Sequence, residues 1–104
     1  MGYYTQYELD FVGNIEPNDY EEIQVYIRSD DTMQYAIVDE QECKWYDHEK
    51  DMIQMSKRFP YVVFMLRGQG EESGDLWVKY FKDGKRQIAE ARITYDEFDS
   101  NKLI

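Results

Sequence analysis

The chain has 104 residues, 42% of them hydrophobic and 16% aromatic, and a formal net charge of −10 at pH 7. That length and composition predict one folded domain, residues 1–104, with too many hydrophobic residues for a disordered protein. The order of its predicted elements, described below, places the domain in the α+β class. One cysteine excludes an intramolecular disulfide, and the lack of a leader or a membrane-length apolar run predicts a cytoplasmic protein.

The N-terminal part of the chain predicts a strand followed by a helix. Residues 3–12 alternate apolar and acidic side chains, which is the pattern of a strand with one wet face. Pro17 and the acidic residues after it favour a helix start, so we predict a helix over residues 19–28. A strand remains the alternative there, because apolar residues in this segment also recur at every second position.

The middle of the chain predicts two strands, a helix and a central strand. Residues 33–38 and 42–46 are expected strands that a polar turn connects. A helix should follow over residues 47–58, because apolar residues recur there at helical spacing and Pro60 lacks the N–H needed for continuation. The apolar run 61–66 is rich in β-branched and aromatic residues, as in a strand that is covered on both faces.

The C-terminal part of the chain predicts a β-hairpin. Residues 76–82 and 86–95 are expected strands, and Asp83 with Gly84 offers a two-residue turn between them. The element order then predicts a ferredoxin-like βαββαβ antiparallel sheet, with two helices on one face and the hairpin as an extra C-terminal addition. The tail, 96–104, is polar except for three apolar side chains, and it either docks or frays.

No recognised catalytic or metal-binding pattern surrounds the reactive residue types. His48 is the only histidine, and between two acidic residues at a helix start it is expected to be exposed and not catalytic. One Cys and one His form no recognised zinc site. The loop 68–75 lacks the lysine of a phosphate loop and the ligand order of an EF-hand. We therefore expect no enzyme activity, metal or cofactor, and a flexible acidic loop.

Acidic side chains are concentrated in the first half of the chain. Residues 1–52 carry 3 basic and 14 acidic side chains, a net charge of −11, whereas residues 53–104 carry 9 and 8, a net charge of +1. Such a field repels nucleic acid and anionic membranes and attracts basic surfaces, although acidity can also serve only to keep a protein soluble. The residues expected to bind a partner lie on helix starts, turns and the glycine loop: Asp19, Glu21, Glu22, Asp30, Asp31, Asp39, Glu40, Glu42, Glu71, Glu72 and Asp75.

Aromatic and basic residues of the C-terminal hairpin support an alternative. Trp77 and Phe81 alternate with other residues of a predicted strand around Lys79 and Lys82, and more basic residues follow. Ferredoxin-like sheets of RNA-recognition modules stack bases on exposed rings, but their two-aromatic signature is missing here and the net charge opposes phosphate contacts. The alternative is an accessory module that binds a protein or nucleic-acid partner through exposed sheet aromatics and the basic hairpin.

Three stretches, residues 44–49, 56–60 and 70–77, resemble a family of small uncharacterised acidic proteins encoded by phages. The resemblance lies in the part of the chain after residue 40. Small acidic phage proteins often inhibit host defence, including restriction and CRISPR nucleases, so the resemblance implies an inhibitor in the host cytoplasm. It implies no catalytic residues, but it draws attention to the carboxylates and to Trp77 in the last stretch.

Together these features predict a non-enzymatic phage-type binding protein. It would inhibit a host nucleic-acid-handling defence complex of restriction or CRISPR type through an acidic surface that mimics DNA. Its partner would be a basic nucleic-acid-binding surface of a host protein, with no direct contact to nucleic acid or membrane.

Overall fold

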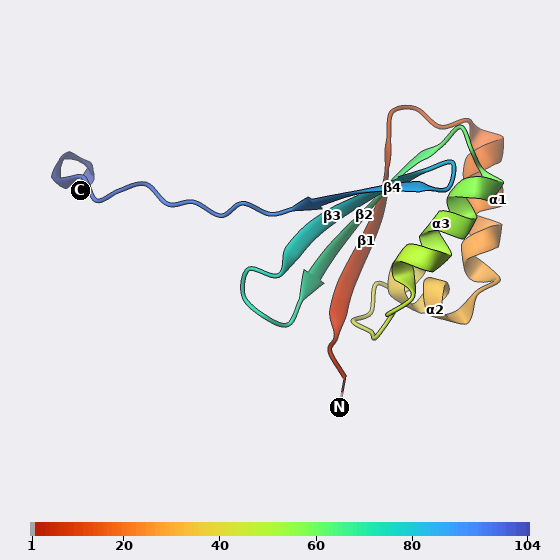
Figure 1. The fold of residues 1–104 in the computed structure, drawn as a ribbon, viewed down its shortest axis with the longest axis horizontal. Helices are drawn as coiled ribbons and strands as arrows, with labels where there is room; N and C mark the ends of the chain where they lie inside the picture. Colours follow the sequence, from red (N-terminus) through yellow and green to blue (C-terminus); the bar gives the residue numbers. More distant parts are fainter. Residues whose placement is uncertain (1) are drawn as a thin grey trace.

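The computed structural model describes residues 2–104 and has an α+β fold (Figure 1). The strands form a four-stranded antiparallel sheet in the order β1-β2-β3-β4, and the helices lie on one of its faces while the other face stays open. In chain order the elements are β1 (Thr5–Val12), α1 (Pro17–Arg28), α2 (Asp31–Met33), a π-helical turn η1 (Gln34–Val38), α3 (His48–Arg58), β2 (Val63–Gly70), β3 (Leu76–Lys82), β4 (Lys85–Glu90) and a short 3₁₀ turn η2 (Ser100–Lys102).

The core lies between the sheet and the helices. Its largest fully buried side chains include Phe64 of β2, Phe81 of β3 and Trp45, which precedes α3. Burial of a side chain of this size contributes about 1.5–3 kcal/mol, so these residues supply much of the attraction between the two layers. The helices add further buried side chains: Ile23, Ile27, Met33, Ala36, Met52 and Met55.

The predicted helix over residues 19–28 is confirmed as α1, and the strand alternative is wrong. Ile23 and Ile27, one helical turn apart, are fully buried, whereas Val25 between them is 70% exposed. A strand would have placed all three side chains on one face. The helix begins at Pro17, a residue well suited to the first helical position because its missing N–H has no partner there.

The strands predicted at 33–38 and 42–46 are wrong. The first segment is helical, because the Asp30 side chain accepts a hydrogen bond from the Met33 backbone N–H (3.0 Å) and starts α2. In the second segment only Cys43 pairs with β1, through two backbone hydrogen bonds with Thr5 of 3.0 Å each. The α+β class is therefore confirmed, but the topology does not confirm a ferredoxin-like order.

β3 and β4 pair antiparallel around the predicted turn, but the topology does not confirm a hairpin that is added to a ferredoxin-like sheet. β3 spans the predicted residues, and Asp83 and Gly84 have φ angles of 47° and 78°, as a tight two-residue hairpin turn requires. The hairpin strands are the third and fourth strands of the sheet and not an addition to it. β4 ends at Glu90, whereas the prediction extended to residue 95.

The predicted central strand and the predicted second helix differ from the structure in detail. β2 is covered on one face only, because its burial alternates and the side chains of Arg67 and Gln69 are exposed on the open face. α3 matches the predicted helix, and the side chain of Asp47, the residue before it, makes no capping hydrogen bond. Within residues 2–104 no helix has the length and apolar character that a membrane crossing needs. The residues after β4 run away from the domain (Figure 1).

Ser56 connects α3 to the hairpin turn. Its side chain is fully buried, and its hydroxyl donates to the Ile53 carbonyl (2.7 Å) while accepting a hydrogen bond from the Gly84 backbone N–H (2.9 Å). The turn therefore depends on the helix for one of its backbone hydrogen bonds.

We predict that Ser56→Ala lowers the free energy of unfolding by about 1–2 kcal/mol, because the Gly84 N–H loses its partner. Urea denaturation measures the change. Ser29→Ala is the matched control, since its exposed hydroxyl bonds only within the end of α1 and its loss should cost about 0.5 kcal/mol or less. Equal losses in the two variants would contradict the role assigned to Ser56.

Candidate functional site

The strand order separates the acidic and basic parts of the chain in space. β1 is one edge of the sheet and β4 is the other. η1 packs beside β1 and α1, whereas α3 packs over β3 and β4. The acidic first half thus lies mainly at the β1 edge, and the basic hairpin lies at the opposite edge.

Seven of the predicted partner-binding residues come from α1, α2 and the turn after η1, and we call them the acidic surface. All except Asp19, which is half-buried, have exposed side chains. Glu22 is the one of them with an ion pair, a 4.0 Å contact with Arg58 in which both side chains are well exposed, and such a pair is worth little. The members of the acidic surface are Asp19, Glu21, Glu22, Asp31, Asp39, Glu40 and Glu42.

The other predicted residues are not brought to this surface. Asp30 caps α2. The glycine loop is tied to the N-terminal segment, because the Tyr3 hydroxyl donates to Asp75 (2.5 Å) and the Tyr4 N–H donates to Glu71 (3.1 Å). These bonds hold the loop beside the N-terminal segment, and the expected flexibility of the loop stays a prediction. Of the loop carboxylates only Glu72 has an exposed side chain without such a bond, and its backbone N–H donates to the Tyr3 hydroxyl.

The aromatics of the alternative interpretation do not form an exposed platform. Phe81 is fully buried under the helices. Trp77 faces the helices as well, and its ring stacks on His48 with the centroids 5.1 Å apart and an angle of 17° between the planes. Tyr80 does point to the open face, where it is half-buried. The alternative keeps its basic hairpin but loses the stacking surface.

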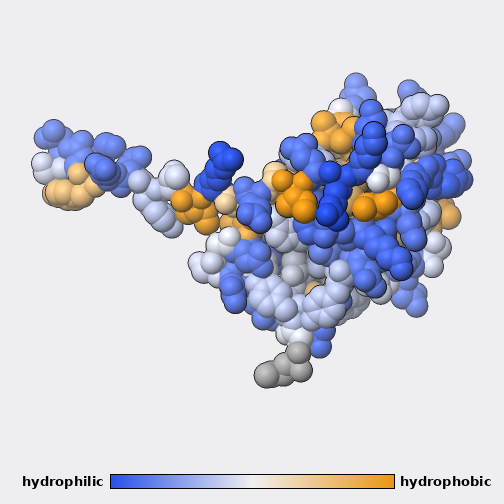
Figure 2. Space-filling model, viewed as in Figure 1, coloured by the Kyte–Doolittle hydropathy of each residue, from blue (hydrophilic) through white to orange (hydrophobic). Residues whose placement is uncertain are grey.

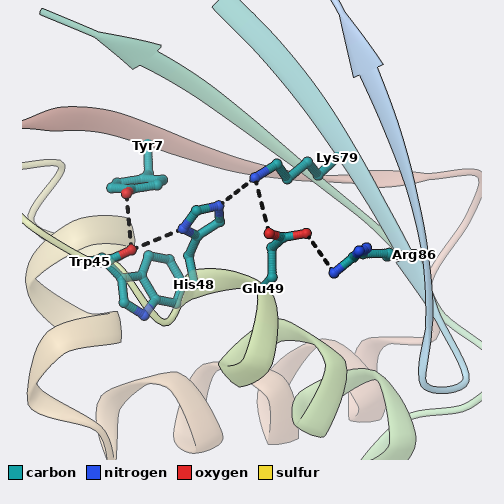
Figure 3. Close-up of polar contacts among 6 residues, drawn as sticks. All are labelled: Tyr7, Trp45, His48, Glu49, Lys79 and Arg86. Atoms are coloured by element: carbon teal, nitrogen blue, oxygen red, sulfur yellow. Dashed lines mark hydrogen bonds and ion pairs between the residues drawn. The ribbon is translucent and has the colours of Figure 1, made fainter.

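A polar cluster between α3 and the sheet was not predicted from the sequence (Figure 3). His48 is half-buried, which corrects the expectation that it is exposed. Its Nδ1 lies 2.9 Å from the Trp45 carbonyl oxygen, and its Nε2 lies 2.7 Å from Lys79 Nζ. The Tyr7 hydroxyl donates to the same Trp45 carbonyl (3.1 Å), and burial raises the pKa of Tyr7 to about 12.

The hydrogen-bond partners decide the state of His48. A carbonyl oxygen only accepts, so Nδ1 carries the proton, and Nε2 accepts from the Lys79 ammonium. Burial lowers the pKa of His48, and the nearby Lys79 charge lowers it further. His48 is therefore a neutral imidazole with both nitrogens engaged, and it has no free lone pair for acid–base chemistry.

Glu49 belongs to the same cluster and forms its ion pairs. Lys79 Nζ lies 3.6 Å from Glu49 Oε2, and the Arg86 guanidinium lies 2.9 Å from Oε1 without the alignment of a hydrogen bond. The Lys79 side chain is only 11% exposed, and its ammonium also lies 4.2 Å from the centre of the Trp77 ring. These contacts hold the start of α3 against β3 and β4.

One signal in the sequence could have located this cluster. Trp77, Lys79 and Phe81 occupy alternate positions of one strand, so they share a face. Two apolar neighbours on that face indicate that the lysine points inward, where a charge needs a partner. Which residue supplies it depends on the tertiary fold.

Among the described residues no group of three or more His, Cys, Asp or Glu side chains is arranged to hold a metal ion. Comparison with models of protein families, with curated proteins and with solved structures finds no match for this chain. The resemblance to phage proteins thus stays a prediction.

We predict that acid destabilises the fold through His48. Its pKa is lowered in the folded state, so below about pH 6.5 the unfolded state binds the proton first. The stabilisation is present above that pH and is lost as the pH falls toward the folded pKa. Thermal unfolding is measured at about pH 7.5 and about pH 5. Between these two pH values the melting temperature of the wild type should fall by more than that of His48→Gln. Equal drops would contradict the prediction.

We predict that Glu49→Gln lowers the free energy of unfolding by about 2 kcal/mol, because the mostly buried Lys79 ammonium keeps only neutral partners. Asp47→Asn is the matched control: it removes one charge near the same helix start from an exposed side chain and should cost about 0.5 kcal/mol or less. Chemical denaturation at neutral pH compares the two. A loss in Glu49→Gln no larger than in the control would show that the ion pairs do not stabilise α3.

Proposed function

We propose that this protein is a non-enzymatic binding protein whose acidic surface occupies a basic, nucleic-acid-binding surface of a partner protein. The separation of charge is the observation that carries the proposal. Exposed carboxylates with few ion pairs lie on α1, α2 and the turn after η1, away from the basic hairpin. Carboxylates so exposed can each accept hydrogen bonds from a partner's arginines and lysines.

Inhibition follows from this mode of binding. A partner whose basic groove holds the acidic surface cannot hold nucleic acid in the same groove. Electrostatic attraction also speeds the encounter, because fields of opposite sign steer the two proteins together. Following the resemblance to phage proteins, we propose a host defence complex of restriction or CRISPR type in the cytoplasm as the partner.

The polar cluster of His48 supports binding over catalysis. Each of its reactive atoms already contacts another residue of the chain, and the cluster lies where α3 meets the sheet. We infer that its role is to fix the helical layer that carries the acidic surface.

We predict that reversing two charges of the acidic surface, Asp39→Lys with Glu42→Lys, abolishes capture of the partner from a nuclease-treated bacterial lysate. Both side chains are exposed, so the fold should be unaffected. The control, Glu72→Lys with Glu90→Lys, changes the net charge equally at other exposed sites and should keep binding. Quantitative mass spectrometry of the captured protein compares the variants. Equal capture by both would contradict the proposal.

A second arm of the same experiment separates groove mimicry from general acidity. Contacts that are close and partly desolvated persist in salt, whereas attraction across more than about 8 Å is screened at physiological ionic strength. The captured complex should survive several times that salt and should be displaced by duplex DNA. A complex that holds DNA and this protein together would leave binding intact but rule out mimicry.

A further inference from the structure

The open face of the sheet has an apolar hollow beside the hairpin turn. Val12, Val63 and Tyr80 line it, and Lys82 and Lys85 stand at its border, around a space of about 430 Å³. Val12 is half exposed although it is apolar. The helices cover the opposite face, so no other element of residues 2–104 closes this hollow (Figure 1).

The two lysines at this border repel each other. Lys82 and Lys85 are directly opposite in the β3–β4 ladder, and like charges in that position destabilise a sheet. Within the part of the chain that the structure describes, neither ammonium has a carboxylate at ion-pair distance. The hollow therefore suits a ligand with an apolar centre and negative charges beside it.

The tail of the chain has this composition. It leaves β4 after a last backbone hydrogen bond from Ala91 to Leu76 (3.0 Å) and runs away from the domain. Phe98 is 81% exposed, and its neighbours along the chain are acidic: Asp96, Glu97 and Asp99. Figure 2 shows apolar side chains at the base and at the tip of this tail, with no surface to cover them.

The acidic–aromatic segment, residues 96–99, has some local order but few contacts. Asp99 accepts a hydrogen bond from the Asn101 N–H (2.9 Å), which shapes the chain just after Phe98. Asp96 has one ion pair, with Lys102 at 3.3 Å, in which both side chains are exposed. An exposed pair of this kind is worth little, so Asp96 can exchange it for another cation.

We propose that the acidic–aromatic segment of one copy of the chain binds in the hollow of a second copy. Phe98 enters between Val63 and Tyr80, and the carboxylates beside it meet Lys82 and Lys85. The contact buries an exposed aromatic ring and separates the opposed lysines by a negative charge. Two copies that exchange tails in this way form a closed dimer with two identical contacts.

The geometry of β4 favours a second copy over the chain's own hollow. The hollow lies at the Lys85 end of β4, and the tail leaves from the Glu90 end, about 17 Å away along the strand. The chain from Ala91 to Phe98 spans at most about 25 Å when fully extended. Reversal of direction over the sheet would use several of these residues, whereas the observed tail already points outward.

Light scattering across a concentration series tests the proposal. We expect the wild type to reach twice the chain mass of 12.6 kDa, and Phe98→Ala to raise the dissociation constant of the dimer at least about tenfold. The control is Tyr35→Ala, which removes an exposed aromatic ring from η1 on the covered side of the molecule and should leave the constant unchanged. A monomer at every concentration, or a dimer indifferent to Phe98→Ala, would overturn the proposal.

A complementation arm identifies the two surfaces. Lys82→Glu with Lys85→Glu should also prevent dimer formation, and it keeps like charges opposite each other, so the sheet should be affected little. Mixed with Phe98→Ala, this variant supplies an intact tail to an intact hollow, so one of the two contacts is restored, and the mixture should associate at concentrations at which neither variant alone does. No association in the mixture would overturn the pairing. Hydrogen-exchange protection of residues 96–99 in a monomer would show that the tail binds its own domain instead.

Discussion

The charge of Lys79 constrains how the helical layer lies on the sheet. Lys79 is on the inward face of β3, between Trp77 and Phe81 along the strand, and its side chain is only 11% exposed, so water cannot solvate the ammonium fully. A buried charge is tolerated only with partners, and here they come from the first turn of α3: the neutral imidazole of His48 and the carboxylate of Glu49. The start of α3, and the loop that leads to it, therefore have one position over the hairpin.

Local sequence signals predicted the elements whose partners are close in the chain. α3 ends before Pro60 as expected, and the turn at Asp83 and Gly84 carries the positive φ angles that its residue types favour. Residues 33–38 were misinterpreted because apolar residues there fit a strand as well as a helical turn. The residue that favoured a helical turn was Asp30, whose side chain caps the turn by accepting a hydrogen bond from the Met33 N–H. The sequence alone does not show whether that hydrogen bond forms.

The features of the candidate site also differ in whether they could be predicted from the sequence. The charge asymmetry between the two halves of the chain is visible in the sequence, and the strand order turns it into a separation in space. The roles of Asp75 and Glu71 could not be predicted, because their partners, Tyr3 and Tyr4, lie about 70 residues away in the chain. His48 was likewise assigned to solvent from its acidic neighbours, whereas its surroundings are set by Lys79, 31 residues later.

A sheet with one covered face offers two surfaces that need not compete. Most of the acidic surface belongs to the helical layer, and its member Glu40 also borders a pocket with Gln6 and Arg67 of the open face. The hollow beside Lys82 and Lys85 lies at the other end of that face. A dimer formed through the tails would leave both acidic surfaces free. Two linked copies that bind one partner assembly gain from effective concentration, so modest individual contacts can give a durable complex. The gain depends on the partner presenting two basic sites at a matching distance, as assemblies with two-fold symmetry do.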